Sequence, residues 1–543
     1  MKTVVHSCTP FKDQKPGTSG LRKKTRVFME PGYVETFVQS IFNAIGGCVG
    51  KTLVVGGDGR YFNAEVIQII LRMAAANGAA RIIVGQGGLL STPAVSNLIR
   101  QRGADGGLIL SASHNPGGIT EDFGLKYNMS NGGPATESLT AIIYAETQKI
   151  PAYQTILAED LDLRQLRETS LGDMVVDIID PVADYAELMG QLFDFDAIRA
   201  LIADGFTLRF DAMHAVTGPY ATAILEDILG APKGTVMNGV PSVDFGKGHP
   251  DPNPSRAKSL VGLVMSPEGP DFAAASDGDG DRNMILGKGV YVTPSDSLAL
   301  LAANAHLAPG YTRGLAGIAR SMPTSAAADR VAETLGLECF ETPTGWKFFA
   351  NLLDAGRVTL CGEESAGTGG DHVREKDGLW AVLLWLNILA VRKISVADIL
   401  QDHWQRFGRN YYSRHDYESV DKDKADTLIS ALVAALPGLA GQRFAGVTVR
   451  SADQFSYHDP VDGSVSQNQG IRLNFDGGGR AVLRLSGTGT VGATLRVYLE
   501  RYESASGDLG IETQAALADI AAATRAITGL TERIGRTEPD VMT

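Results

Sequence analysis

The chain has 543 residues, of which 44% are hydrophobic and 20% charged, so it is long enough for about three or four globular domains. Its formal net charge of −13 argues against nucleic acid or an anionic membrane as the main partner, although a locally basic site could still bind an anionic small molecule. The four cysteines have neither metal-binding nor disulfide-framework spacing, and the N-terminal residues lack the apolar stretch of a secretory signal, so we expect a cytoplasmic protein with no obligate protein partner.

The first three quarters of the chain repeat one pattern three times. Each repeat begins with an apolar strand followed by a helix that ends at glycine, with strands expected at 52–60, 207–215 and 314–322 and helices at 63–78, 218–230 and 324–336. A second apolar strand then runs into a polar loop, at 107–116, 272–281 and 358–367. Alternating strands and helices predict α/β domains with mainly parallel mixed sheets, in which ligands bind beyond the carboxyl ends of the strands.

The pattern changes near residue 406. Before that point, the apolar run 379–391 is too short to span a bilayer and predicts a buried helix. After it come short strands at hairpin spacing and then a helix at 512–530, with the strands expected at 447–453, 471–476, 481–489 and 493–500. We therefore predict α/β domains at 1–184, 185–298 and 299–405, and a C-terminal α+β domain at 406–543.

The first strand-to-loop junction reads SASHNPGG, residues 111–118. It places the hydroxyl of Ser113 beside the imidazole of His114, at a strand end where chemistry is expected. Asn, Pro and Gly are also common in ordinary turns, and an ordinary turn is the alternative interpretation of this segment.

The second junction, SDGDGDR, contains Asp277, Asp279 and Asp281 at alternate positions. Carboxylates this close repel one another unless a cation lies among them, and all-oxygen ligands suit Mg²⁺ or Ca²⁺. An EF-hand would need Gly at the sixth position and Glu at the twelfth, where this chain has Arg282 and Lys288. The loop therefore favours Mg²⁺ over an EF-hand calcium site, and a solvated Asp-Gly turn is the alternative.

Residues 487–492, GTGTVG, match the GxGxxG pattern of dinucleotide-binding loops. That fingerprint requires a following helix, whereas residues 493–500 alternate like a strand. An anion cradle is the better interpretation, with a tight hairpin flanked by surface arginines as the alternative. Its donors would be backbone N–H groups, hydroxyls and guanidinium groups of Arg484, Ser486, Gly487, Thr488 and Arg496.

Six separated motifs together resemble the α-D-phosphohexomutase superfamily and, within it, the phosphoglucomutases. They lie in the family's order at 16–24, 111–118, 276–282, 343–349, 361–380 and 484–489, so the resemblance covers almost the whole chain. It implies four domains around a central cleft, each contributing one loop. It also implies the interconversion of α-D-glucose 1-phosphate and glucose 6-phosphate through a phosphoserine and glucose 1,6-bisphosphate, with one Mg²⁺ per chain.

The resemblance also implies roles for individual residues. Ser113 would be the phosphoserine nucleophile, and its phosphate would hold Mg²⁺ together with Asp277, Asp279 and Asp281. Arg22 and Arg282 would contact the transferring phosphoryl group, and His114 and Lys376 would transfer protons. The residues that would bind the sugar are Thr344, Gly345, Glu363 and Ser365. Those that would bind the other phosphate are Arg484, Ser486, Gly487, Thr488 and Arg496. His114 could instead anchor its loop, and Lys376 could be a phosphate counter-ion or a substrate contact.

Two positions depart from the family pattern. Ser111 stands where Thr is usual, and Ala366 stands where the glucose-type enzymes carry Phe, which bears on substrate preference. A phosphomannomutase or another phosphohexomutase is therefore an alternative. A hydrolase that releases the serine phosphate to water is a second alternative, but zinc phosphatases of that kind need several His ligands and the nine histidines of this chain form no such cluster. A catalytically silent scaffold is a third, but it would be expected to have lost Ser113 or the three aspartates, and this chain has both.

Overall fold

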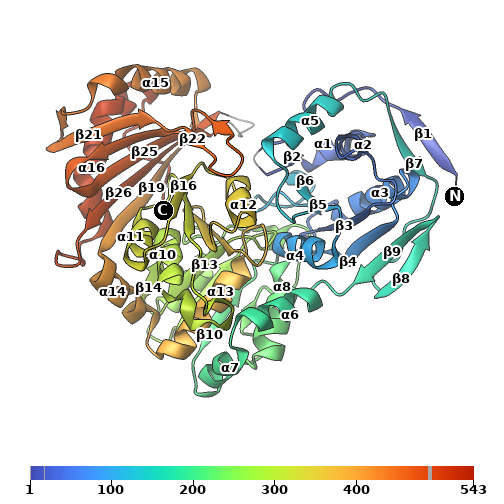
Figure 1. Cartoon of the computed structure of the whole chain (residues 1–543), viewed down its shortest axis with the longest axis horizontal. Coiled ribbons are helices and arrows are strands. Elements are labelled where there is room, and N and C mark those ends of the chain that lie inside the picture. The colour runs from blue at the N-terminus through green and yellow to red at the C-terminus, as the bar shows by residue number, and fades with distance from the viewer. Residues whose placement is uncertain (1, 18, 487–491) are drawn as a thin grey trace.

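The computed structural model describes the whole chain except residues 1, 18 and 487–491 (Figure 1). Four units, each built on its own β-sheet, follow one another along the sequence. In Figure 1 the first unit, in blue, and the last, in orange and red, lie on opposite sides of the molecule, and the green and yellow units join them. This arrangement confirms the expected fold class of three α/β units followed by an α+β unit.

The first unit is a seven-stranded mixed sheet in the order β2-β6-β5-β3-β4-β9-β8. Its central strands are parallel and its edges antiparallel. Helices α2 and α3 bury one face and α4 the other. The elements are β1 (Thr3–Ser7), β2 (Leu21–Lys24), α1 (Thr25–Phe28), α2 (Tyr33–Ala44), β3 (Thr52–Gly57), α3 (Asn63–Ala76), β4 (Arg81–Leu89), α4 (Thr92–Arg102), β5 (Gly106–Leu110), β6 (Asp122–Met129), α5 (Glu137–Thr147), β7 (Ala152–Ile156), β8 (Arg167–Leu171) and β9 (Met174–Ile179).

In the second and third units, three adjacent strands run parallel, and the last of them pairs antiparallel with the strand that follows it in the chain. Their sheets have the orders β11-β10-β12-β13-β14 and β16-β15-β17-β18. The second unit comprises α6 (Ala183–Leu192), α7 (Phe195–Ala203), β10 (Leu208–Asp211), α8 (Thr217–Ala221) with a π-helical continuation (Thr222–Ile228), β11 (Val236–Met237), a 3₁₀ turn (Phe245–Lys247), α9 (Lys258–Val264), β12 (Phe272–Ser276), β13 (Asn283–Gly287) and β14 (Val290–Val292). The third comprises α10 (Pro294–Asn304), 3₁₀ turns (Ala305–Leu307, Pro309–Tyr311), β15 (Ile318–Ser321), α11 (Ala327–Leu335), β16 (Cys339–Thr342), α12 (Lys347–Asp354), β17 (Leu360–Glu363), β18 (Gly367–Gly370), α13 (Gly378–Arg392) and α14 (Val396–Phe407).

The fourth unit is a seven-stranded antiparallel sheet in the order β20-β21-β24-β25-β26-β19-β27, with α15, α16 and α17 packed against it. Its long strand β19, which pairs with β26, was not predicted. The elements are β19 (Arg409–Val420), α15 (Lys422–Ala435), a 3₁₀ turn (Leu436–Gly438), β20 (Arg443–Phe444), β21 (Val447–Gln454), β22 (Tyr457–His458), β23 (Val465–Ser466), β24 (Ile471–Phe475), a 3₁₀ turn (Asp476–Gly478), β25 (Gly479–Ser486), β26 (Ala493–Glu503), α16 (Thr513–Thr528), α17 (Leu530–Ile534) and β27 (Val541–Met542).

Helix α13 contains the longest apolar run and is buried along nearly its whole length, as the sequence predicts. Its side chains join one large core with those of the second and third units. Asp377 caps the helix by accepting a hydrogen bond from the Trp380 backbone N–H at 3.1 Å. Among the described helices, none is long and apolar enough to cross a membrane alone. Helices α13 and α14 have the length and composition of a membrane span only when taken together, and they are bent by 86° relative to one another. The predicted domain boundaries stay predictions.

Candidate active site

The loop after β5 holds Ser113 in a buried position facing the second unit. Ser113 is 1% exposed, and its backbone has φ +55°, in the left-handed region. Its N–H donates to Ser111 Oγ at 2.7 Å, and its own Oγ donates to Asp277 Oδ2 at 2.9 Å. His114 Nδ1 lies 3.4 Å from the Ser113 Oγ. The structure thus brings the predicted serine, its neighbouring imidazole and the aspartate loop together.

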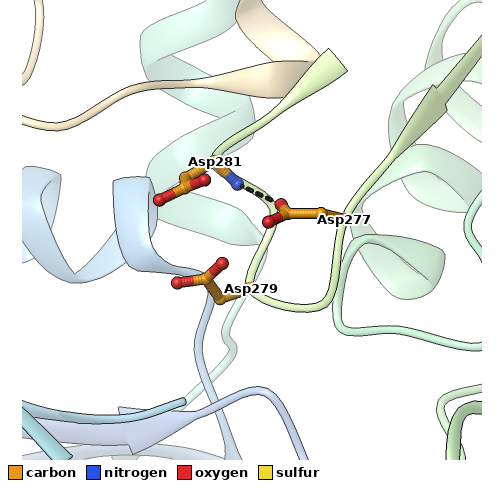
Figure 2. Close-up of side chains that lie close together, drawn as sticks. All are labelled: Asp277, Asp279 and Asp281. Atoms are coloured by element: carbon orange, nitrogen blue, oxygen red, sulfur yellow. Dashed lines mark hydrogen bonds between the residues drawn. The ribbon is translucent and has the colours of Figure 1, made fainter. Parts of the chain in front are cut away.

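The three aspartates follow directly on β12, in a loop that turns at Gly280 (φ +80°). Figure 2 shows their side chains projecting to the same side of the loop, and one oxygen from each lies within 4.8 Å of the others. The backbone N–H of Asp281 donates to Asp277 Oδ1 at 2.9 Å. Oδ1 of Asp279 and Oδ1 of Asp281 are both buried and have no hydrogen-bond partner in the described part of the chain.

These carboxylates repel one another strongly. Burial, followed by the charges of Asp281 and Asp279, raises the pKa of Asp277 well above its ordinary value. A divalent cation placed among them would relieve this repulsion and would also satisfy the two unpartnered oxygens. The donor set consists entirely of oxygen, which suits a hard cation such as Mg²⁺.

Cationic side chains surround the aspartates. Lys126, on β6, donates to Asp279 Oδ2 at 2.5 Å, and the Thr92 hydroxyl donates to the same oxygen at 2.6 Å. Although burial opposes ionisation, the charge of Lys126 and these hydrogen bonds keep the pKa of Asp279 below its usual value. Lys376 Nζ lies 3.2 Å from Asp281 Oδ2.

Two arginines complete the cationic surroundings. Arg282 Nε is 3.8 Å from Asp277 Oδ2 and 3.9 Å from Asp281 Oδ1. Arg22 on β2 pairs with Gly124 of β6, and its buried Nε has no hydrogen-bond partner among the described residues. Burial lowers the pKa of Arg22, whereas the charge of Asp279 raises it and that of Arg282 lowers it. The predicted residues Arg282 and Lys376 thus lie at the aspartates, and an anionic group bound there would meet converging positive charge.

His114 is held in its neutral form. Burial lowers the pKa of His114 well below its ordinary value, and the charges of Arg282 and Arg22 lower it further. The His249 ring lies 6.1 Å from the His114 ring, centroid to centroid. A neutral imidazole beside the serine can accept a proton, as a general base must.

A cavity of about 370 Å³ opens over these groups, and all four units line it. This confirms the central cleft that the resemblance implies. Its lining includes residues of the first unit (His114, Lys126), the second (Asp281, Arg282), the third (Thr344, Gly345, Glu363, Ser365, Lys376) and the fourth (Arg414, Asp416, Arg496).

The third unit contributes two connected loops to the cleft. Glu363 ends β17, and its Oε1 accepts a hydrogen bond from the Gly345 N–H at 2.8 Å. The Thr344 hydroxyl is buried and lacks a hydrogen-bond partner among residues that the structure describes. Ala366 O accepts from the Asn283 N–H at 2.9 Å, which ties this region to the aspartate loop. The loops that carry Thr344, Gly345 and Glu363 are therefore connected to the candidate metal site.

The fourth unit brings arginines to the opposite end of the cleft. Arg484 on β25 lies directly across from Arg496 on β26, which in turn lies across from Asp416 on β19. Arg414 Nε is 3.1 Å from Asp416 Oδ1, and Arg414 Nη1 is 3.3 Å from Glu364 Oε2 in the third unit. A strand follows the glycine-rich loop, so the expectation against a dinucleotide fold is confirmed. Ser486 ends β25, whereas Gly487 and Thr488 lie outside the described residues.

Sequence reasoning missed several residues of this site. Lys126, Arg414 and Asp416 are charged residues within strands, and nothing in the sequence pattern indicates that their side chains face the cleft. Asp58 and Arg60 had a detectable signal, because the segment GGDGR places them at the end of a predicted strand. Strand ends in parallel sheets are where ligand-binding residues gather.

Comparisons with known proteins agree along the whole chain. Family models match domains I, II and III of phosphoglucomutase/phosphomannomutase at residues 13–154, 183–289 and 294–407, and the phosphoglucomutase-1 C-terminal domain at 409–540. The phosphoglucomutase of Rhizobium radiobacter is 63% identical over 543 residues, covering 100% of both chains. The cytoplasmic phosphoglucomutase of Populus tremula is 52% identical, covering 98% of each. The crystal structure of pp63/parafusin, a phosphoglucomutase from Paramecium, in its open form, has a TM-score of 0.93 at 48% identity and covers 100% of this chain and 99% of its own.

Proposed function

The chain belongs to the phosphoglucomutase/phosphomannomutase family, and we propose that it is an isomerase that interconverts α-D-glucose 1-phosphate and glucose 6-phosphate. The observation that carries this proposal is the buried Ser113 hydroxyl, 2.9 Å from Asp277, on loops whose residues His114 and Asp281 line a cleft shared by all four units. Similarity to phosphoglucomutases over the full chain favours glucose as the sugar.

We propose that Ser113 carries the phosphoryl group. A sugar hydroxyl oxygen attacks the phosphorus, a new P–O bond to the sugar forms, and the bond to Ser113 Oγ breaks. The product is glucose 1,6-bisphosphate, which turns over in the cleft and returns its other phosphoryl group to Ser113. Such transfer depends mainly on positioning and on charge stabilisation.

Asp277, Asp279 and Asp281 would hold one Mg²⁺ together with an oxygen of the serine phosphate. The unpartnered oxygens of Asp279 and Asp281 fit this role. When bound, the metal supplies positive charge to the transferring phosphoryl group. Arg22, Arg282 and Lys126 add positive charge at the same place and orient the phosphoryl oxygens.

The sugar hydroxyl must lose a proton as it attacks, and the leaving serine oxygen must not retain full negative charge. Neutral His114, with Nδ1 3.4 Å from Ser113 Oγ, can accept the Ser113 hydroxyl proton when that oxygen attacks phosphorus, and the imidazolium so formed can return the proton when the oxygen leaves. Lys376 lines the cleft and is the candidate proton partner for the sugar hydroxyl. It could also serve as a counter-ion or contact the substrate.

We propose that the remaining cleft residues bind the two ends of the substrate. Thr344, Gly345, Glu363 and Ser365 would read the sugar hydroxyls, and Glu363 has one carboxylate oxygen already fixed by Gly345. The non-reacting phosphate would lie at the fourth unit, on Arg484, Ser486, Gly487, Thr488 and Arg496, with Arg414 beside it. Hexose phosphates are thus the proposed partners, and a cytoplasmic location is proposed with them.

The purified protein tests this function directly. It should convert glucose 1-phosphate to glucose 6-phosphate in the presence of Mg²⁺ and a trace of glucose 1,6-bisphosphate, and it should prefer this substrate to mannose 1-phosphate and N-acetylglucosamine 1-phosphate. A preference for mannose 1-phosphate would favour a phosphomannomutase. Release of inorganic phosphate without isomerisation would favour a hydrolase, and inactivity on all three sugars a silent scaffold.

A further inference from the structure

The side chain of Arg60, just beyond β3, lies beneath the Ser113 loop and is fully buried. Its Nη2 donates to Ser113 O at 2.7 Å, and its Nη1 donates to Asn115 O at 3.3 Å and to Asp122 O at 2.9 Å. Its Nε and Nη2 also contact the Asp58 carboxylate at 2.9 Å. The guanidinium group therefore directs its N–H donors to three carbonyls around the serine and to one buried carboxylate.

Ser113 needs such support because its backbone is strained. A φ of +55° is costly for a residue with a Cβ and persists only where the surroundings enforce it. Ser111 Oγ fixes the Ser113 N–H, and Arg60 fixes its carbonyl. Gly278 of the aspartate loop closes the other side, since a Cβ there would lie 2.4 Å from Ser113 O. The carbonyl is thus held between Arg60 and the metal loop.

Arg60 is itself held from two directions. The Asp58 carboxylate, also fully buried, accepts hydrogen bonds from the Arg60 side chain. It also accepts one from the Arg60 backbone N–H at 3.1 Å. On the other face, the Phe245 ring of the second unit lies 5.1 Å from the guanidinium carbon. This ring belongs to the segment whose Val243 O accepts a hydrogen bond from the Tyr61 N–H at 2.8 Å. The guanidinium is therefore packed between Asp58 of the first unit and Phe245 of the second.

We propose that Arg60 is a positioning residue for phosphoryl transfer, which holds Ser113 in its left-handed conformation so that Oγ points at the aspartates. The inference rests on the proposed role of Ser113 as phosphoryl carrier. Arg60 does not touch the reacting atoms in this role; it acts through the Ser113 carbonyl. Transfer is sensitive to such an effect, because a displacement of about 1 Å at a reacting atom can lower a rate by roughly 100-fold.

The geometry requires arginine in particular. A guanidinium offers five N–H donors in a fixed plane, whereas a lysine ammonium offers three donors around a point charge. Arg60→Lys keeps the positive charge opposite Asp58 but cannot reach all three carbonyls at once. The substitution therefore separates the fork geometry of Arg60 from its charge.

The experiment measures single-turnover transfer from [³²P]glucose 1,6-bisphosphate to dephosphorylated full-length enzyme. Its rate constant does not depend on the fraction of enzyme that is folded, so a purely structural defect would lower the labelled amount but not the rate constant. For Arg60→Lys we expect the rate constant to fall by about 10- to 100-fold. The bisphosphate concentration at half-maximal rate should change by less than about threefold, because the third and fourth units bind the sugar and the distal phosphate. Arg72→Lys on α3, whose guanidinium pairs with exposed Asp160, is the matched control and should transfer at the wild-type rate.

A wild-type rate constant in Arg60→Lys would overturn this inference while leaving the proposed function intact. Labelling of Ser113→Ala would instead overturn the proposed function. If Arg60→Lys does not yield folded protein, Arg60→Gln decides the matter, since its amide keeps N–H donors but has neither the planar fork nor the charge of the guanidinium. The rate constant of that variant should fall by at least about 10-fold, and an unchanged value would equally overturn the inference.

Discussion

At the scale of single residues, Asp279 links two units through one carboxylate. Oδ2 is held by Lys126 and Thr92 of the first unit, and the buried Oδ1 has no partner within the described residues. This division of roles is what a metal ligand needs: one oxygen fixes its orientation and the other is free to bind.

Asp279→Asn should weaken Mg²⁺ binding by about 10-fold or more, because it removes one of three carboxylate charges from the site. The measurement is the Mg²⁺ dependence of activity in enzyme first stripped with EDTA. Asp173→Asn, at an exposed position on the β8–β9 turn, is the control and should titrate like the wild type. Full activity of the stripped wild-type enzyme, with metal content verified as negligible, would remove the metal site from the account.

Glu363→Gln should relax sugar discrimination more than phosphate binding. The glutamine carbonyl can still accept the Gly345 N–H, so the loop should keep its shape, while the carboxylate proposed to read the sugar is lost. A lost polar contact of this kind is worth about 1–3 kcal/mol of selectivity. The ratio of kcat/KM for glucose 1-phosphate and mannose 1-phosphate measures it, and an unchanged ratio would show that this loop does not read the sugar.

At the scale of elements, hydrophobic patterning predicted the strands that end at the site. β5, β12 and β17 are short apolar runs bounded by polar loops, and all three form as expected. β19 escaped detection because its sequence, RNYYSRHDYESV, carries charged residues that are stabilised by long-range pairing with β26. Charged partners such as Lys126 and Arg414 could not be assigned for the same reason, since only tertiary contacts decide where their side chains lie.

The contact between the two catalytic loops gives a prediction at this scale. Gly278→Ala should displace the Ser113 carbonyl, because the new Cβ would lie 2.4 Å from it, and overpacking of this kind costs about 1–3 kcal/mol. We expect a large loss of kcat together with a lower melting temperature. Gly262→Ala is the control, since no atom lies within 4 Å of its added Cβ and alanine favours helix α9. Equal activity of the two variants would contradict the interlocking of the loops.

At the scale of the whole molecule, the cleft exists only where the four units meet. The roles that the resemblance implied for Ser113, Asp277 and Glu363 were stated from the sequence. In the structure Ser113 contacts Asp277, and their loop neighbours His114 and Asp281 line the same cavity as Glu363. The paired arginines Arg484 and Arg496 lie on the fourth unit, whereas Ser113 lies on the first. Under the proposed mechanism, a bisphosphate would bridge the first and fourth units, and its free phosphate would be held at these arginines in both orientations.

Arg496→Ala should accordingly weaken binding of glucose 1-phosphate and glucose 6-phosphate to a similar extent. Guanidinium groups grip phosphate without reading the sugar ring, so either end of the substrate should lose the same contact. The measurement is KM in both directions, with exposed Arg450→Ala as the control. An effect confined to one monophosphate would mean that the fourth unit does not hold both orientations.

The central claim is that Ser113 passes its phosphoryl group to a hexose phosphate, and a pulse–chase experiment tests it most directly. Enzyme labelled with ³²P is mixed with excess unlabelled glucose 1-phosphate and quenched within single turnovers. The account predicts that label leaves Ser113, appears first in glucose 1,6-bisphosphate and then in the monophosphates, and never enters the Ser113→Ala variant. Label that remained on the protein during turnover, or that appeared as inorganic phosphate instead of sugar phosphate, would contradict the account.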